Sequence, residues 1–184
     1  MKGSRASRYV AFLRGMNLGR RRIRNDALCE IFRSLGFDDI SAFLASGNMI
    51  FRSPGRTAAE ISGRIESGLR RALGYEVPTF LRTGRQVLAI SREDPFPEPL
   101  PATGGKLQVA LLGDEPVDCA RAKVLAMSTD RDRLALRDRE LYWLPEGRMS
   151  DSELDLAAIE TALGPMTIRT RRTLERIAAR FLSD

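Results

Sequence analysis

The fold of the first half of the chain is decided by the stretch Tyr9-Val10-Ala11-Phe12-Leu13-Arg14-Gly15, a short apolar run followed by an arginine and a glycine. The apolar run predicts a strand. Asn25 or Asp26 can cap the helix that follows, and apolar residues recur at helical spacing until Gly36 ends it. The chain therefore opens with a strand and a helix joined by a basic loop.

Two short strands, residues 40–44 and 49–51, flank Ser46-Gly47-Asn48, which predicts a tight connection. Thr57 caps a second helix that Gly74 closes, and residues 77–81 predict a fourth strand. The predicted order is strand, helix, strand, strand, helix, strand.

Four prolines alternate with other residues between positions 95 and 101, which favours an extended linker. Beyond it the same order of elements returns, followed by one extra helix. The strands are expected at residues 107–112, 133–136, 141–144 and 166–169, and the helices at residues 117–127, 151–163 and 171–182. We divide the chain into a first repeat with a connecting helix (1–90), a linker (91–105) and a second repeat with a C-terminal helix (106–184).

This order is that of the split βαβ unit, so the predicted fold class is α+β with two tandem ferredoxin-like (βαββαβ) repeats. Each such unit is an antiparallel sheet with its helices on one face. The first-repeat strands are apolar on both faces, because Val10 and Phe12 alternate with Ala11 and Leu13. We expect the second repeat or the C-terminal helix to cover the other face, which argues against an open platform for stacked bases.

The amino-acid composition limits which catalytic sites, metal sites and partners are possible. The 184 residues include 30 Lys+Arg, 24 Asp+Glu and no His, which excludes His-based triads and His-ligated zinc. Residues 1–90 carry 16 basic and 7 acidic side chains, whereas residues 91–184 carry 14 and 17. An anionic partner should therefore prefer the first half. Cys29 and Cys119 are predicted to be unlinked, and no metal or cofactor is predicted.

A right-handed crossover brings the end of the first strand to the sheet edge that holds the Ser46 turn. Guanidinium groups, glycine amides and a helix N-terminus, each of which binds anions, meet at this edge. The predicted ligand-binding residues are Arg14, Gly15, Asn17, Gly19, Arg20, Arg22, Arg24, Ser46, Gly47 and Asn48.

The favoured function is binding of a phosphorylated or other anionic small molecule at this edge, with nucleic acid as a less favoured partner. Two alternatives remain open: a small enzyme that acts on an acidic substrate there, and a protein-interaction module whose glycines only make turns. The apolar segments are too short for a membrane span or a signal peptide, so we expect a cytoplasmic protein. The sequence does not set the oligomeric state or a catalytic residue.

The motifs of residues 9–51 resemble the signature of the bacterial domain-of-unknown-function family 1697. The resemblance lies in residues 9–19, Leu28, Leu35-Gly36-Phe37, Ser46-Gly47-Asn48 and Phe51. It implies a tandem ferredoxin-like protein without an assigned reaction, and it marks Arg14, Gly15, Asn17, Gly19 and the Ser46 turn as signature positions.

The sequence departs from that family pattern in both halves. Arg20-Arg21-Arg22 stands where the family has a second glycine and a lysine-rich loop. In the second half, residues 150–154 and 169–173 replace a Ser-Lys-Leu-like and an Arg-Asn-Trp-like segment. If the second half completes a site in the family, that site is altered here.

Overall fold

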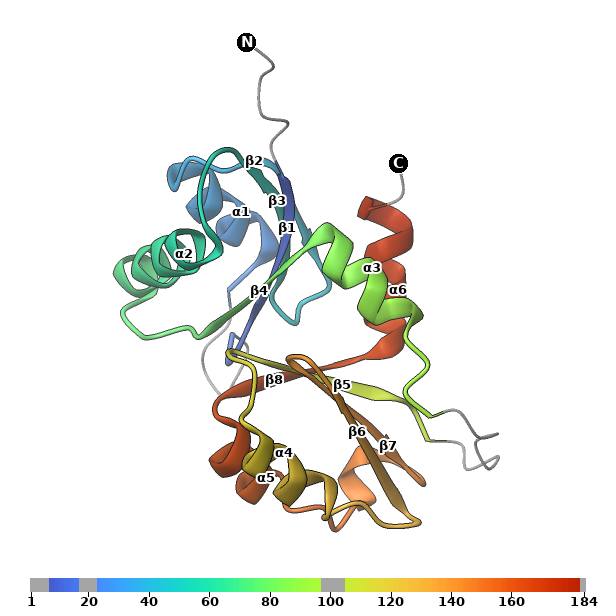
Figure 1. Cartoon of the computed structure of the whole chain (residues 1–184). Helices are drawn as coiled ribbons and strands as arrows, with labels where there is room; N and C mark the ends of the chain where they lie inside the picture. The colour runs from blue at the N-terminus through green and yellow to red at the C-terminus, as the bar shows by residue number, and fades with distance from the viewer. Residues whose placement is uncertain (1–6, 17–22, 97–104, 183–184) are drawn as a thin grey trace. The chain divides into compact units, whose positions relative to one another are not determined.

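Two four-stranded antiparallel sheets, one in each half of the chain, carry the fold in a computed structural model that describes residues 7–16, 23–96 and 105–182 (Figure 1). The chain forms two compact units. The first comprises Met1–Leu88 and Ile177–Asp184, and the second comprises Ala89–Arg176. The chain thus leaves the first unit, builds the second and returns. The predicted linker 91–105 falls in the second unit, and residues 97–104 of it lie outside the described residues.

The first sheet has the strand order β2-β3-β1-β4, with two helices on one of its faces (Figure 1). Its elements are β1 (Ser7–Leu13), α1 (Asn25–Ser34), β2 (Asp38–Phe43), β3 (Asn48–Ser53), α2 (Ala58–Leu73) and β4 (Thr79–Thr83). A further helix, α3 (Gly84–Arg92), follows β4.

The second sheet repeats this arrangement in the order β6-β7-β5-β8. Its elements are β5 (Gln108–Leu112), α4 (Asp118–Leu125), β6 (Asp132–Arg137), β7 (Glu140–Pro145), the 3-10 turn η1 (Met149–Asp151), α5 (Leu156–Leu163) and β8 (Met166–Thr170). The last helix, α6 (Arg171–Ile177), continues into a π turn, η2 (Ala178–Leu182). The predicted class, α+β with tandem ferredoxin-like repeats and a C-terminal helix, is confirmed.

Local signals in the sequence set the ends of α2. The Thr57 hydroxyl accepts from the Glu60 amide, while the Glu60 carboxylate accepts from the Thr57 amide, which makes a reciprocal capping box. Gly74 ends the helix in the left-handed conformation at φ 78°. Both ends lie where the sequence predicts them.

The core of the first unit lies between the sheet and its two helices. Phe51 of β3 is at its centre, with its ring centroid 4.5 Å from that of Phe37 and 5.5 Å from that of Phe32. The other face of this sheet receives the η2 turn, where Phe181 meets Phe43 edge-on and its carbonyl accepts from Arg8. Of the two expected covers, the second repeat or the C-terminal helix, the C-terminal segment is seen to pack on this face.

The start of α5 differs from the prediction. The sequence pattern places the helix from residue 151, but Asp155 is the N-cap, and its carboxylate accepts from the Ala158 amide at 2.9 Å. The preceding residues instead form η1 and an extended connection. The cap-like serines mislead because Ser152 has a partner far away in sequence, the carboxylate of Asp132.

Candidate functional site

The end of β1 lies beside the turn between β2 and β3, as the crossover rule predicts. Phe12 pairs with Asn48 in the antiparallel ladder, and the Leu13 amide donates to the Gly47 carbonyl at 2.8 Å. On the other side, the Arg14 amide donates to the Pro78 carbonyl at 3.0 Å. The first residue beyond the strand is thus fixed between two neighbouring connections.

The Asn48 side chain holds the β2–β3 turn together. It is fully buried, and its Nδ2 donates to the Phe43 carbonyl at 2.8 Å and to Ser46 Oγ at 2.9 Å. Asn48 therefore shapes the turn from inside, while Ser46 lies on its exposed side.

Gly47 is required by both its conformation and its surroundings. Its φ is +73°, and a Cβ atom there would lie 2.9 Å from Met16 Cγ and 3.0 Å from Leu13 Cβ. Gly15 also has a positive φ of 75°. These two glycines let the backbone beyond β1 pass close to the turn.

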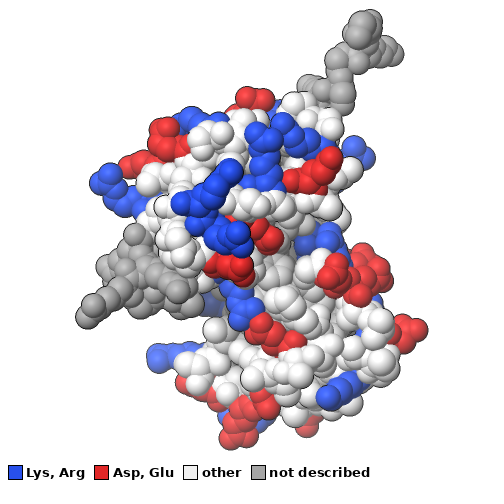
Figure 2. Space-filling model, turned by 90° about the vertical axis from the view of Figure 1, so that its left-hand side faces the viewer, with Lys and Arg blue, Asp and Glu red and all other residues white. Residues whose placement is uncertain are grey.

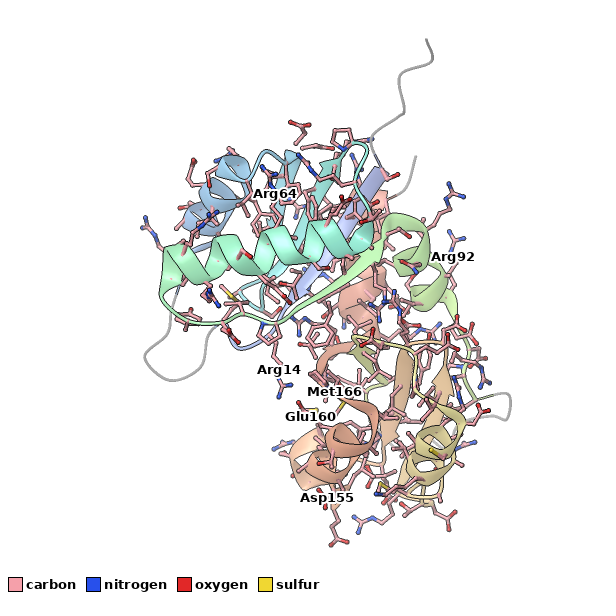
Figure 3. All side chains as sticks on the ribbon, turned by 60° about the vertical axis from the view of Figure 1, so that its left-hand side comes forward. Arg14, Arg64, Arg92, Asp155, Glu160 and Met166 are labelled. Atoms are coloured by element: carbon pink, nitrogen blue, oxygen red, sulfur yellow. The ribbon has the colours of Figure 1, made fainter. Side chains whose placement is uncertain are left out.

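Arg14 is half-buried, and its side chain points outward from the end of β1 (Figure 3). Arg24 is exposed at the N-cap position of α1, and its side chain makes no capping hydrogen bond because guanidinium has no acceptor atom. The start of α1 thus carries a positive side chain beside the positive end of the helix dipole. The other predicted ligand residues, Asn17, Gly19, Arg20 and Arg22, lie outside the described residues.

Charge on the helix-covered side of the first unit is mixed. Figure 2 shows basic and acidic side chains interspersed there, without one continuous basic patch on the atoms in view. The charge excess of the first half is therefore not explained by this side of the unit.

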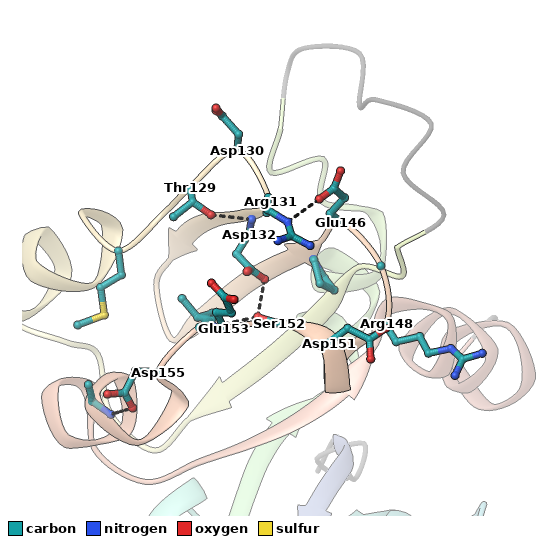
Figure 4. A pocket seen from close by; sticks show the side chains of 15 residues that line it. Thr129, Asp130, Arg131, Asp132, Glu146, Arg148, Asp151, Ser152, Glu153 and Asp155 are labelled. Atoms are coloured by element: carbon teal, nitrogen blue, oxygen red, sulfur yellow. Dashed lines mark hydrogen bonds and ion pairs between the residues drawn. The ribbon is translucent and has the colours of Figure 1, made fainter.

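The second unit holds a cavity of about 900 Å³ that the sequence analysis missed (Figure 4). A smaller hollow of about 360 Å³ lies beside α2 in the first unit. The larger one is lined by Met127, Thr129, Asp130, Arg131, Asp132, Pro145, Glu146, Gly147, Arg148, Asp151, Ser152, Glu153, Leu154, Asp155 and Ala158. The available signal was Trp143, the sole tryptophan, whose indole needs an acceptor when it is buried on a strand.

Both cysteines are free thiols. Burial is the main cause that raises the pKa of the half-buried Cys29 thiol. Across the described ranges, no three Cys, Asp or Glu side chains are arranged to hold a metal ion. None of the described helices has the length and apolar character needed to cross a bilayer.

A family model described as "Protein of unknown function (DUF1697)" matches residues 6–142. The chain belongs to this family. The match includes the first repeat and the Ser46 turn, whereas the two second-half stretches that depart from the family pattern, residues 150–154 and 169–173, lie beyond it.

A solved structure of the conserved bacterial protein SP0830 from Streptococcus pneumoniae is similar over most of both chains. The TM-score is 0.66 with 18% identity, and the similarity covers 95% of this chain and 97% of that one. At this identity the likeness shows the fold alone. The search of curated proteins found no significant match.

Proposed function

We propose that the chain binds a phosphorylated or otherwise anionic small molecule at the edge where β1 ends. One observation carries the proposal: the end of β1 at Arg14-Gly15 lies beside the Ser46-Gly47 turn. The next element along the chain is α1, whose N-cap is the basic Arg24. A guanidinium forms charge-assisted hydrogen bonds with phosphate oxygens, glycine lets the backbone amide approach, and a helix N-terminus favours negative charge.

Charge supports this edge over the large cavity of the second unit. The first half of the sequence has the basic excess, and Arg20, Arg21 and Arg22 precede α1. Carboxylates dominate the lining of the cavity, so it would repel a phosphate. An anionic ligand therefore favours the edge of the first unit.

Thermal-shift titration with inorganic phosphate, pyrophosphate and a sugar phosphate tests the proposal. A ligand present at one hundred times its dissociation constant stabilises the folded protein by about 2.7 kcal/mol, so a saturable rise in Tm is expected. The double variant Arg14→Ser/Arg24→Ser should bind at least about tenfold more weakly, because each lost charge-assisted hydrogen bond contributes roughly 1.5–3 kcal/mol.

The matched control is Arg33→Ser/Arg56→Ser, which removes the same charge from the opposite edge of the same sheet. Arg33 is in the last turn of α1, and Arg56 precedes α2. The control should keep the affinity of the native chain. No saturable shift with any of the three probes, or equal losses in both double variants, would overturn the proposal.

A salt titration separates a small ligand from nucleic acid. If residues 20–24 contact a duplex, the slope of log affinity against log salt is about −0.9 per neutralised phosphate. Replacement of Arg20, Arg21, Arg22 and Arg24 by Ser should then flatten that slope by up to ~3.6. No binding of RNA or DNA at low salt would discard nucleic acid as the partner, and equal slopes would exclude these arginines as its contacts.

A further inference from the structure

The cavity of the second unit is built by two connections. One joins α4 to β6, and the other runs from the end of β7 through η1 to α5. Its polar lining holds six carboxylates and two guanidinium groups: Asp130, Asp132, Glu146, Asp151, Glu153 and Asp155 against Arg131 and Arg148. The lining therefore has an excess of negative charge.

Asp132 supplies a buried acceptor that faces this space. The residue is only 6% exposed, yet it lines the cavity. Its Oδ1 accepts from Trp143 Nε1 and from Ser152 Oγ, both at 2.7 Å. Oδ2 receives no hydrogen bond from the residues that the structure describes, and it stays accessible to solvent, because it is not among their fully buried side-chain atoms that lack a partner. The carboxylate is thus held in place with one oxygen left to accept from a ligand.

The carboxylates of the cavity lining already stabilise one positive side chain, that of Arg131. Arg131 at the rim donates from Nε to Glu146 at 2.8 Å. The hydrogen bond and charge of Glu146 raise the pKa of this guanidinium, and the charges of Glu153 and Asp132 raise it further. Carboxylates on separate parts of the lining therefore act together on a positive group placed among them.

The geometry favours an organic cation over a metal ion. Within the described residues, the carboxylates do not converge as a metal site requires. Asp155 is engaged as the cap of α5, and Glu146 is paired with Arg131. Asp130 and Glu153 are exposed, and Figure 4 shows Glu153 close to the buried Asp132 carboxylate.

Apolar residues complete the lining. Met127, Pro145, Leu154 and Ala158 are among them. A ligand that fits has hydrocarbon to cover these surfaces and several N–H donors to reach separate carboxylates. Ammonium and guanidinium groups supply only donors, which matches a lining rich in acceptors.

We propose that this cavity binds a small organic cation, an alkyl ammonium or guanidinium compound, whose charged group donates to Asp132 Oδ2 near Glu153, while the exposed Asp130 adds negative charge at the rim. This site is separate from the anion edge and does not depend on it.

Trp143 provides a direct readout. It is the only tryptophan in the chain, and its indole N–H is bonded to the same carboxylate. The full-length chain, labelled with ¹⁵N, is titrated with 1,4-diaminobutane and with agmatine, while the single indole N–H resonance is followed by NMR. Both cations should shift it saturably, whereas the uncharged 1,4-butanediol should not.

The test variant is Asp130→Asn/Glu153→Gln, since both side chains are exposed and their replacement leaves the Trp143–Asp132 bond in place. Affinity should fall at least about tenfold, because two charged acceptors are lost. The matched control, Asp114→Asn/Asp138→Asn, removes two exposed carboxylates from the opposite edge of the same sheet. Its affinity should stay within about twofold of that of the native chain. This change is smaller than the tenfold loss expected for the test variant, which corresponds to roughly 1.4 kcal/mol.

Three outcomes would overturn the proposal. They are no saturable indole shift with either cation, an equal shift with the diol, and equal weakening in the test and control variants. Asp132→Asn adds an independent check, because it keeps an acceptor for Trp143 while it removes the buried charge. Undiminished cation binding by that variant would also contradict the proposal.

Discussion

The two repeats share one topology, but their longer connections lie at opposite edges of the sheet. At the edge where the first strand ends, the first repeat has the long connections, residues 14–24 and the turn 44–47. The second repeat spans the same positions with residues 113–117 and the two-residue turn 138–139. This edge is elaborated in the first repeat and minimal in the second.

At the opposite edge the relation is reversed. The second repeat runs through residues 126–131 and 146–155, whereas the first uses only residues 35–37 and 54–57. The helix that follows is also shorter in the second repeat, because α5 has 8 residues and α2 has 16. Duplicated sheets thus offer two separate places for loops to grow, and loops positioned by a rigid sheet commonly carry binding residues.

The space beneath these connections, which we call the junction, is also filled differently in the two repeats. In the first repeat, Phe37 fills the junction and contacts the rings of Phe32 and Phe51, while Arg64 Nε donates to the Leu35 carbonyl at 2.6 Å. In the second repeat the junction is hollow. The difference teaches that the cavity arises from connection length and not from the sheet itself.

The largest expected effect tests the filled junction against the hollow one. Phe37→Ala should lower the free energy of unfolding by roughly 3–5 kcal/mol, because it removes a buried ring from close aromatic contacts. Leu154→Ala, in the half-buried wall of the cavity, should cost about 1 kcal/mol. Urea denaturation measures both, and similar costs would show that the two junctions are packed alike.

Two glycine substitutions, one in each repeat, compare the edges that carry the long connections. Gly47→Ala should destabilise the fold by roughly 2–4 kcal/mol, because it combines a left-handed φ with contacts of 2.9 and 3.0 Å to Met16 and Leu13. Gly147→Ala at the cavity should change stability by at most about 1 kcal/mol, since a Cβ there meets nothing within 4 Å. Thermal unfolding of both variants checks this, and an equally stable Gly47→Ala protein would contradict the packing of the β1 end.

The buried carboxylate gives an intermediate effect. Asp132→Ala should cost about 1–3 kcal/mol, because the buried Trp143 indole N–H and the Ser152 hydroxyl lose their common acceptor. Asp132→Asn retains an acceptor oxygen and should cost less. Denaturant unfolding monitored by Trp143 fluorescence compares the two, and an equal cost would mean that the hydrogen bonds are not what holds this junction.

The smallest effect concerns Asp39, an exposed carboxylate near the start of β2. Hydrogen bonds from Arg52 and Arg8 lower the pKa of Asp39, so the folded form binds its proton less readily than the unfolded chain. The resulting stability is present above the unfolded pKa near ~4 and is lost as the pH falls through the lower folded pKa. Asp39→Asn should cost under about 1 kcal/mol at pH 7 and progressively less below pH ~4. Unfolding curves at both pH values check this, and a cost independent of pH would rule out the ion pairs as its cause.

The fold could be predicted from the sequence because its signals are local. Thr57 with Glu60 and the left-handed Gly74 fix α2, and the crossover rule then brings Arg14 beside the Ser46 turn. The role of Asn48 inside that turn could not be predicted, because its partners depend on how the turn folds. The ligand at the edge stays a prediction.

The cavity could not be predicted because it depends on contacts between distant residues. Ser152 resembles a helix cap in sequence, but it donates to Asp132, which lies twenty residues earlier and is also bonded to Trp143. No window of neighbouring residues contains all three. Only the folded chain shows that they share one carboxylate.

The return of the chain to the first unit has a consequence during protein synthesis. The residues of η2 that pack on the first sheet are made only after the whole of Ala89–Arg176 has been translated. At a bacterial rate of 5–20 residues per second, the first sheet waits roughly 5–20 s for that covering, which is long compared with the formation of helices and hairpins. Throughout that interval Phe43 of the nascent chain lacks its Phe181 partner, and a chaperone that shields apolar surface would act there first.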